Sequence, residues 1–560
     1  MKNVNLKNAL RAVRERYARK TAIVSNGVAY SYSELNKLIK ICKKAIARSD
    51  TTVLINVDDR LKAIILILSA IDCDVTFIPV DSDRPDSFLK NITDNFAKIR
   101  IINDVCLETG ELFLQTIEHH DHTDSPRCLG DEGVMSIMYT SGSTGKPKGV
   151  LVRSNSVFNL LYRPSFISLS DEDVVASYSS LSFDASTFEI FSPLLAGGTL
   201  VLLDKMTVLD EEILVQFIER YKISCMWMTA GLFRNHMLSG YCKALTKLKH
   251  LITGGDRVDH QAAVAFLEST SFTKLYHAYG PTENTVFTTI SELELSSIRE
   301  EKRLPIGKLV QGVDYLLYDE DTGHYLKTGV GHLYVSGKGL SAGYHNNPTE
   351  TDKAFCTIDN TRYYDTGDVV EYTENGEFYF LGRQDRQVKL NGHRVELDDI
   401  EKNLENDELI VKALCFMWQE HLVALIESKN KEFELESLIS RARSQLSAYA
   451  IPDFFIENNE WPLSKNNKVD TKYLINNTIK ILENRQNRST SNSVKSIVEE
   501  ILGKCINHRS IGLFDIGFDS LSMLTLSHKL SKSFDIKITL LDLYSSGTLE
   551  EVENLVTSKK

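Results

Sequence analysis

Short apolar runs alternate with amphipathic stretches along residues 1–384. The runs TTVLINV (51–57), VTFIPV (75–80) and VVASYSSLSF (174–183) have the composition of buried strands. The stretch LDEEILVQFIERY (209–221) repeats its apolar residues at the spacing of a helix that is buried on one side. Because strands and helices alternate in this way, we expect residues 1–384 to form a large α/β domain of mainly parallel sheets covered by helices.

The pattern changes at Asp385. Residues 385–478 combine short strand-like runs such as RQVKLNG (386–392) with helical ones such as ELDDIEKNLEN (396–406), which predicts a small α+β domain. Residues 479–492 have no usable apolar period and are predicted to be a linker. Residues 493–557 carry helical patterns throughout, which predicts an all-α four-helix bundle.

Composition narrows the class of protein. A chain of 560 residues exceeds one hydrophobic core, and its apolar fraction of 42% and charged fraction of 25% are those of a soluble globular protein. The net charge of -12 disfavours nucleic acid and anionic membranes as partners. The nine cysteines form no CxxC pair or metal-spaced cluster, and the longest apolar run (63–71) is too short to cross a bilayer. We therefore expect a cytoplasmic protein.

A glycine-rich loop, YTSGSTGKPKGV (139–150), is the first candidate for chemistry. Backbone N–H groups freed by its glycines, together with Lys146 and Lys148, suit an anion such as a phosphate. The loop does not fit the pattern GxxxxGK[ST], because only two residues separate Gly142 and Gly145 and a proline follows Lys146. Taken alone, its composition also suits a polar surface turn.

The loop belongs to a series of motifs that follow one another in a fixed order along nearly the whole chain. This ordered series resembles the adenylation domains of nonribosomal peptide synthetases, within the adenylate-forming superfamily. The resemblance implies that a carboxylate attacks the α-phosphate of ATP to give an acyl-adenylate and pyrophosphate. The motifs are YSYSELN (30–36), YTSGSTGKPKGV (139–150), LSFDASTFEIF (181–191), LITGG (251–255), AYGPTENTV (278–286), YYDTGDVV (363–370), GRQDRQVKLNGHRVEL (382–397) and PLSKNNKVD (462–470).

The same resemblance implies an ATP site. Tyr279 stacks on adenine, Asp368 accepts hydrogen bonds from the ribose hydroxyls, and Arg383 reaches the ribose or a phosphate. Glu283 is similar to the glutamate that holds Mg2+ in the family. Without the motifs, Tyr279 would be interpreted as a core aromatic and Asp368 as a turn cap. The predicted ATP-binding residues are Thr140, Ser141, Gly142, Ser143, Thr144, Lys148, Gly255, Tyr279, Gly280, Thr282, Asp368 and Arg383.

Two further residues link the small domain to the reaction by resemblance. Lys468 is predicted to bridge the substrate carboxylate and the α-phosphate, although a lysine in a polar loop is otherwise a solvated surface residue. Asp385 matches the hinge about which the small domain rotates between adenylation and thioester formation. After that rotation, the strand RQVKLNG (386–392) is expected to replace the PLSKNNK loop at the active site.

The C-terminal segment LFDIGFDSLSM (513–523) resembles a peptidyl carrier domain. Its Ser520 is then the attachment point of 4'-phosphopantetheine, although IGFDS departs from the family's LGGxS and a serine here also suits a helix cap. The implied partners are an amino acid, a phosphopantetheinyl transferase and a downstream condensation or tailoring enzyme. A small helper protein is a further candidate.

The remaining motif positions describe the substrate pocket. Asp184 matches the aspartate that pairs with a substrate α-ammonium group. The lining residues carry no second charge, and as a set they resemble valine-selecting pockets, so valine is the favoured substrate. Isoleucine, leucine and other small apolar amino acids remain alternatives, because Ala278 and Val286 depart from the valine pattern. The predicted lining residues are Ala185, Phe188, Trp227, Ile252, Gly254, Ala278, Val286 and Phe287.

Two other functions stay open. An acyl-CoA or aryl-CoA synthetase-like ligase is opposed by Asp184 and by the fused carrier. An inactive scaffolding homologue is opposed by the retained Lys468, Asp368 and Glu283.

Overall fold

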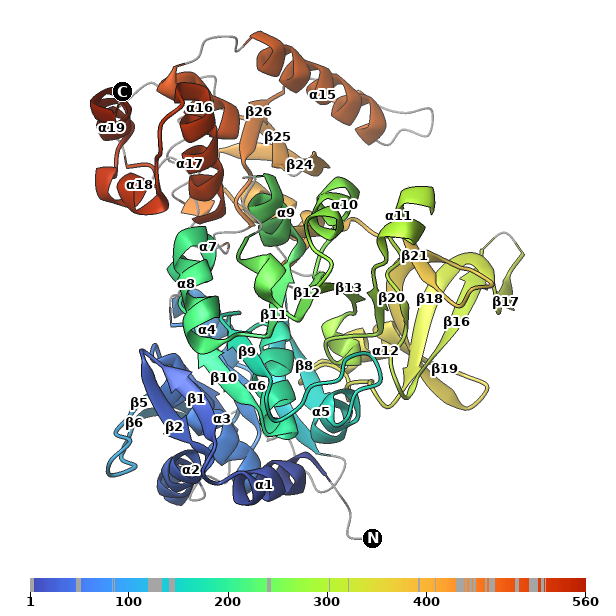
Figure 1. Ribbon diagram of the computed structural model, residues 1–560. Helices are drawn as coiled ribbons and strands as arrows, with labels where there is room; N and C mark the ends of the chain where they lie inside the picture. Colours follow the sequence, from blue (N-terminus) through green and yellow to red (C-terminus); the bar gives the residue numbers. More distant parts are fainter. Residues whose placement is uncertain are drawn as a thin grey trace.

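A computed structural model shows how the chain folds (Figure 1). It describes residues 5–559 except 47–51, 83, 85, 119–132, 141–146, 239–242, 302, 321, 391–392, 408, 420, 430–437, 439–440, 443–445, 447–449, 459–460, 463–468, 489–492, 503–511, 515–517 and 519.

Two large sheets form the body of the N-terminal part. The nine-stranded sheet, called sheet A here, is parallel from β1 through β13 and antiparallel at both edges. Its strands, in spatial order, are β15 (Lys308–Leu309), β14 (Thr289–Glu292), β13 (Lys274–Tyr279), β12 (His250–Gly254), β11 (Cys225–Thr229), β9 (Val174–Ser177), β10 (Thr199–Leu202), β1 (Thr21–Ser25) and β2 (Val28–Ser31).

The second sheet, sheet B, has a parallel centre formed by β5, β3, β4 and β7, with an antiparallel strand at each edge. Its strands are β6 (Leu112–Glu118), β5 (Lys98–Val105), β3 (Val53–Ile55), β4 (Phe77–Pro79), β7 (Val134–Thr140) and β8 (Lys148–Arg153). The mainly parallel α/β architecture predicted from the sequence is therefore confirmed.

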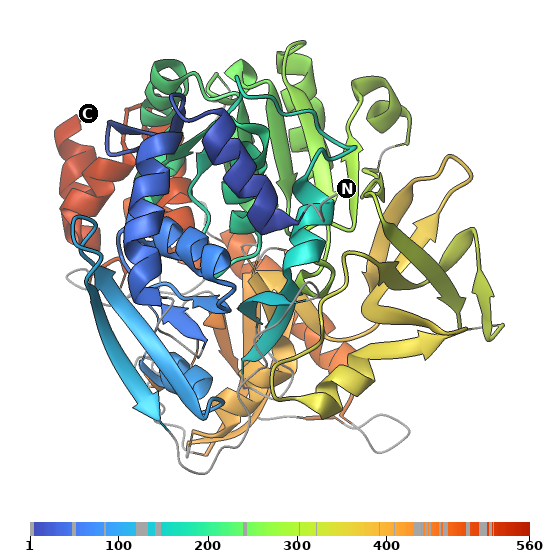
Figure 2. The same ribbon diagram turned by 90° about the horizontal axis from the view of Figure 1, so that it is seen from below.

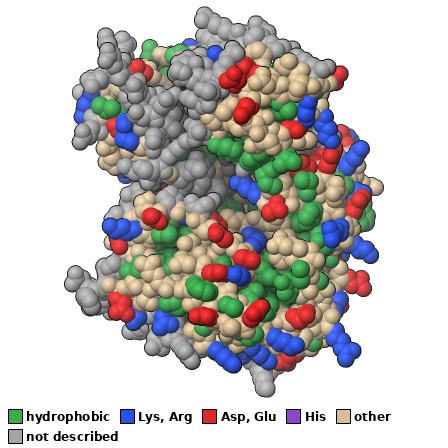
Figure 3. All heavy atoms as spheres, turned by 90° about the vertical axis from the view of Figure 1, so that its left-hand side faces the viewer, with side chains coloured by type: hydrophobic (Ala, Val, Ile, Leu, Met, Phe, Trp, Pro, Cys, Tyr) green, Lys and Arg blue, Asp and Glu red, His purple; other side chains and the backbone are tan. Residues whose placement is uncertain are grey.

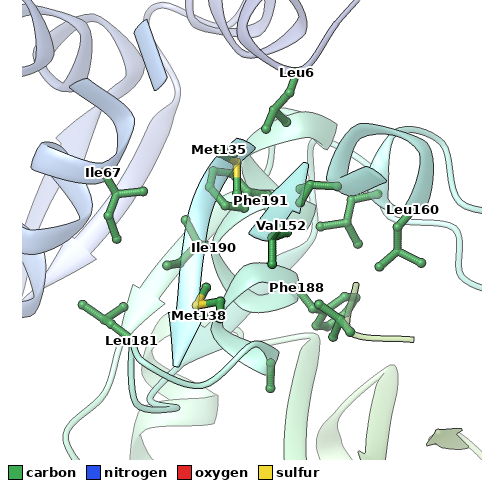
Figure 4. Close-up of a cluster of buried hydrophobic side chains, with 14 of the residues drawn as sticks. Leu6, Ile67, Met135, Met138, Val152, Leu160, Leu181, Phe188, Ile190 and Phe191 are labelled. Atoms are coloured by element: carbon green, nitrogen blue, oxygen red, sulfur yellow. The ribbon is translucent and has the colours of Figure 1, made fainter. Parts of the chain in front are cut away.

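Helices cover these sheets because their apolar faces need partners. Helices α3 and α6 are buried along nearly their whole lengths, as expected of helices that are apolar on all sides. Figure 4 shows Phe188, Ile190 and Phe191 of α6 beside Met135 and Met138 of β7. The helices of this region are α1 (Leu6–Arg16), α2 (Tyr32–Ile46), α3 (Arg60–Cys73), α4 (Asp86–Thr93), α5 (Ser154–Leu161), α6 (Ala185–Ala196), α7 (Lys205–Leu209), α8 (Glu211–Tyr221), α9 (Ala230–Leu238), α10 (His260–Ser269) and α11 (Leu295–Glu301).

A third, antiparallel sheet lies to one side of this body, as both ribbon views show (Figures 1 and 2). Its long strand β20 pairs with β18, β19 and β21, and the chain leaves it for the small domain at Arg383. The elements are β16 (Val313–Asp319), β17 (His324–Leu326), β18 (Gly329–Gly337), α12 (Pro348–Ala354), β19 (Phe355–Ile358), β20 (Thr361–Tyr372) and β21 (Phe378–Arg383).

The small domain has its own hydrophobic clusters around the sheet β24–β25–β26. The described part of the predicted linker differs from the expectation, because residues 479–488 continue helix α15. Leu482 of this helix is buried against the sheet, which gives the segment an apolar contact that its sequence period did not reveal. The elements are β22 (Gln387–Leu390), β23 (His393–Glu396), α13 (Leu397–Glu405), β24 (Ile410–Trp418), β25 (His421–Ser428), β26 (Phe454–Glu457) and α15 (Thr471–Arg488).

The C-terminal helices form the predicted bundle and pack against the large domain (Figure 1). Helix α17 contacts α7 and α9, and one hydrophobic cluster runs through both domains. At the edge of the contact Lys537 pairs with Glu212 of α8. The helices are α16 (Val494–Leu502), α17 (Ser520–Phe534), α18 (Leu540–Ser546) and α19 (Leu549–Lys559).

The surface agrees with the charge balance of the sequence. On the face drawn in Figure 3, Lys and Arg side chains are interspersed with Asp and Glu side chains. Among the described helices, none combines the length and the hydropathy that a bilayer-spanning helix needs.

Candidate active site

A pocket lies beyond the carboxyl ends of β11, β12 and β13, which is where open α/β sheets commonly bind ligands. Apolar side chains, including Trp227 and Phe287, line one part of it, and polar groups from β20 and β21 line another. Strand β22 of the small domain closes the pocket through Gln387 and Lys389. The pocket therefore joins both domains.

Asp184 lies in this pocket immediately before helix α6. Its carboxylate caps no backbone N–H of the helix and accepts a hydrogen bond from the Thr282 hydroxyl at 2.7 Å. Burial raises the pKa of Asp184 to about 6, while the Thr282 hydrogen bond and the Lys389 charge act in the opposite direction. A desolvated carboxylate gains most from a cationic ligand, so the site suits an ammonium group.

We expect the raised pKa of Asp184 to appear in the pH dependence of substrate capture. Protonation below about pH 6 removes the negative charge, so kcat/KM for an amino acid should fall about tenfold per pH unit there. The measurement is kcat/KM in pyrophosphate exchange between pH 5 and pH 8. The Asp184→Asn variant is the matched control, because it should lack this acidic limb. An identical acidic limb in the variant would assign it to another group.

The apolar part of the pocket is built from aromatic side chains in contact. The ring of Phe287 lies 5.6 Å from that of Trp227 and 5.5 Å from that of Phe188. Val286 has a φ of 65°, which is unusual for a β-branched residue and turns the chain so that Val286 and Phe287 both face the pocket. Trp227 and Phe287 thus form an aromatic wall of an apolar slot in the pocket.

The predicted substrate-lining residues fall into two layers. Ala185, Trp227, Ala278, Val286 and Phe287 line the pocket. Phe188, Ile252 and Gly254 are buried behind them. A Cβ on Gly254 would lie 2.0 Å from the Ala278 carbonyl oxygen and 3.2 Å from Trp227, so only glycine fits beside these residues.

Tyr279, Asp368 and Arg383 form one connected group on the polar side. The Tyr279 hydroxyl donates to Asp368, and Arg383 pairs with the same carboxylate. Lys389 lies 5.7 Å from the centre of the Tyr279 ring. Burial raises the pKa of Tyr279 well above its usual range, so the phenol stays a hydrogen-bond donor. The group can offer an aromatic face, a carboxylate and two cations to a nucleotide.

Asp385 connects this group to the small domain. Its carboxylate accepts hydrogen bonds from Arg383 at 2.6 and 2.7 Å and from the backbone N–H of Gln387 at 3.2 Å. The predicted hinge residue therefore lies between the last strand of the large domain and the strand β22 that enters the pocket.

Glu283 follows the glycine–proline turn and is 1% exposed. Its carboxylate accepts a hydrogen bond from the Tyr344 hydroxyl at 2.7 Å. A buried carboxylate fits Mg2+, which commonly takes one or two protein carboxylates and completes its shell with phosphate and water oxygens. In that position Mg2+ would neutralise phosphate charge. No group of three metal-binding side chains occurs among the described residues.

Lys148 is held near Glu283 by a different carboxylate. Its ammonium group lies 2.8 Å from Glu350 and 5.6 Å from the centre of the Tyr344 ring. Hydrogen bonds from Lys148 and Lys353 lower the pKa of Glu350 to about 2, so this carboxylate stays charged at neutral pH. The lysine is thus fixed beside the tyrosine that binds Glu283.

The structure describes only some of the other predicted residues. Thr140, Gly255, Gly280 and Thr282 line the pocket. Ser141, Gly142, Ser143, Thr144 and Lys468 lie outside the described residues, as does the side chain of Ser520, whose backbone begins helix α17.

Several pocket residues were not predicted to be site residues. Gln387 and Lys389 belong to the strand that was expected at the site, so that motif contained a usable signal. Ser182 and Thr366 also line the pocket and lie within the motifs 181–191 and 363–370, so these motifs contained a usable signal too. Arg84 lines the pocket as well, and neither its spacing nor its residue type marks it in the sequence.

Comparison with known proteins defines the class. Residues 10–345 match the family described as AMP-binding enzyme, and residues 492–556 match the phosphopantetheine attachment site. The chain therefore belongs to the AMP-binding enzyme family and carries a carrier domain for 4'-phosphopantetheine at its C-terminal end. ATP and 4'-phosphopantetheine follow as its cofactors, and Mg2+ is standard for the family.

Individual relatives agree with this class. Bacitracin synthase 1 of Bacillus licheniformis is 32% identical over 96% of this chain and 11% of that protein. Surfactin synthase subunit 1 of Bacillus subtilis (strain 168) is 30% identical over 96% of this chain and 16% of that protein. The chain thus spans only a small part of these relatives.

A solved structure shares the whole fold. It is that of a holo nonribosomal peptide synthetase protein containing adenylation and PCP domains, bound to a vinylsulfonamide inhibitor. It has 24% sequence identity, a TM-score of 0.82, and coverage of 99% of this chain and 97% of that chain. The predicted combination of a large α/β domain, a small domain and a helical carrier is therefore confirmed.

Proposed function

We propose that this chain activates a small apolar amino acid, valine first, and loads it onto the 4'-phosphopantetheine arm of its own carrier domain. The observation that carries the proposal is the position of Asp184. This desolvated carboxylate lies between an apolar slot and the Tyr279–Asp368–Arg383 group in one pocket. Such a pocket can hold an amino acid and a nucleotide side by side, with the ammonium group on Asp184.

The first reaction forms a bond between an oxygen of the substrate carboxylate and the α-phosphorus, and it breaks the bond from that phosphorus to pyrophosphate. Both reactants are anions, so alignment and cationic groups lower the barrier more than a base would. Asp184 orients the amino acid, and Tyr279, Asp368 and Arg383 orient the nucleotide. Lys468 is proposed to stabilise the charge that develops between them.

The second reaction joins the thiol sulfur of the arm to the acyl carbon and releases AMP. Here the presence of β22 at the pocket supports the proposed exchange between strand 386–392 and the loop that carries Lys468. The carrier packs on the large domain through α17, the helix that begins at Ser520. A phosphopantetheinyl transferase would be needed to install the arm, and a downstream condensation or tailoring enzyme would take the product.

Valine is favoured because the slot is short, apolar and closed by aromatic rings. A single methylene in such a slot changes the binding free energy by only about 1–3 kcal/mol. Isoleucine and leucine should therefore be activated more slowly rather than rejected.

Pyrophosphate exchange with a panel of acids tests the proposal. We expect kcat/KM to be highest for valine, about tenfold or more lower for leucine and phenylalanine, and lower again for 2-hydroxyisovalerate, which lacks the ammonium group. Exchange with a fatty or aryl acid in place of amino acids would favour an acyl-CoA or aryl-CoA synthetase-like ligase. No exchange with any acid, from a folded protein, would favour a scaffolding role.

A further inference from the structure

The turn that leads to Asp184, residues 180–184, follows a strand of sheet A and is hydrogen-bonded to a carboxylate that follows a strand of sheet B. Asp81 follows β4 of sheet B, whereas Ser180 and Ser182 follow β9 of sheet A. Both serine hydroxyls donate to one oxygen of Asp81, at 2.5 and 2.6 Å. The hydroxyls also lie 2.7 Å from each other. Asp81 thus fastens the tip of the 180–184 turn across the junction between the two sheets.

The base of the same turn has a separate support. Glu189 of α6 is fully buried and accepts hydrogen bonds from the hydroxyl groups of Ser177 and Ser179 at 3.0 and 2.6 Å. Arg60 completes this cluster by binding Ser177 at 2.7 Å and Glu189 at 3.3 Å. Because Glu189 fixes the base, loss of the Asp81 contacts should free only the tip, which leads directly into Asp184.

We propose that Asp81 is a positioning residue for amino acid recognition, which acts by fixing the Ser180–Asp184 turn so that the Asp184 carboxylate faces the substrate ammonium group. The inference rests on the proposed function of Asp184. Ser182 and Asp184 both line the pocket, so a shift of the tip moves the pocket wall itself. Charge-assisted hydrogen bonds are short and directional, and a recognition group needs its support fixed to within about half an ångström.

A double-mutant cycle between Asp81 and Asp184 tests the inference. The variants are Asp81→Asn, Asp184→Asn and their combination, made in the full chain and assayed by pyrophosphate exchange. We expect Asp81→Asn to raise the KM for valine about tenfold, with the KM for ATP changed less than about twofold. In the Asp184→Asn background the same substitution should have little further effect, because the group that it positions is already gone.

A matched control is available in the same segment. Asp58 binds the hydroxyl of Ser82, the residue next to Asp81, at an exposed site. Asp58→Asn should leave both KM values within about twofold of the wild type. If either Asp81 variant fails to fold, Ser182→Ala replaces it, since this change removes one of the two hydroxyl donors. Thermal unfolding of every variant separates lost positioning from lost stability.

The outcomes are distinct. An equal effect of Asp81→Asn in both backgrounds, or equal increases in the KM for valine and for ATP, would overturn the positioning role and leave Asp81 as a structural contact. An unchanged KM for valine in Asp184→Asn would instead contradict the proposed function itself. A large effect of Asp81→Asn on valine that disappears in the Asp184→Asn background would establish the inference.

Discussion

Replacement of Lys468 by alanine is expected to lower amino-acid-dependent pyrophosphate exchange by about two to three orders of magnitude, the usual cost of removing a group that stabilises transition-state charge. Transfer of the acyl group from preformed adenylate to the carrier should be largely spared. The reason is that β22, which brings Gln387 and Lys389 to the pocket, is the strand expected to serve the second half-reaction in place of the lysine loop. The two half-reactions should therefore separate in one variant.

Lys465 offers a matched control, because it lies in the same PLSKNNK segment and its substitution removes the same charge. Lys465→Ala should change either rate less than about twofold, and a surface lysine should cost within about 0.5 kcal/mol of stability. Pyrophosphate exchange measures the first half-reaction, and single-turnover loading from synthetic adenylate measures the second. If Lys468→Ala lowered both rates in parallel, the proposal that the small domain uses different placements for the two half-reactions would be excluded.

The fold could be predicted from the sequence wherever burial imposes a period. The runs around Val53, Phe77 and Val174 became the strands β3, β4 and β9, because a strand between two covered faces must be apolar along its length. The stretch 209–221 became α8, with Asp210 as the N-cap that accepts the Ile213 N–H at 3.1 Å. In both cases the pattern that predicts the element lies within the residues of that element.

The prediction differed from the structure where distant contacts decide the conformation. The strand-like run 174–183 ends as β9 at Ser177, because Glu189 binds Ser179 and Asp81 binds Ser180 in the residues that follow. The predicted linker begins as helix, because Leu482 finds a partner in the small-domain sheet. Neither partner is close in the sequence, so no periodicity could indicate these contacts.

The candidate site likewise combines residues that the sequence indicates with residues that only distant contacts bring to the pocket. Asp184 and Phe287 follow the carboxyl ends of β9 and β13, and Trp227 lies on β11 between these parallel strands. Their meeting in one pocket is implied once the α/β order is known. Arg84 reaches the pocket from the segment that follows β4 of the other large sheet, which no local pattern indicates. Lys389 reaches it only in the observed placement of the small domain, which a sequence does not determine. The roles assigned to all of these residues stay predictions.

Ser520→Ala should abolish acyl loading while leaving amino-acid-dependent pyrophosphate exchange within about twofold of the wild type. The hydroxyl oxygen of this serine is the proposed attachment point of the phosphopantetheine arm, whereas the pocket lies in the other two domains. The exchange rate should therefore be insensitive to the substitution, since the helices α7 and α9 that α17 contacts hold none of the pocket-lining residues. The measurements are intact-protein mass after treatment with a phosphopantetheinyl transferase and coenzyme A, and acyl loading with radiolabelled valine.

Ser522→Ala, two residues further along the same helix, is the matched control and should load normally. If Ser520→Ala still gained both the arm and the acyl group, the attachment site would lie elsewhere. If it lost exchange as well, the carrier would contribute to adenylation. The expected result is full adenylation without loading. A reactive adenylate in a closed pocket is captured by a nucleophile on an arm that is long and flexible enough to enter the pocket. Ser520→Ala would remove the one oxygen atom that is proposed to hold this arm.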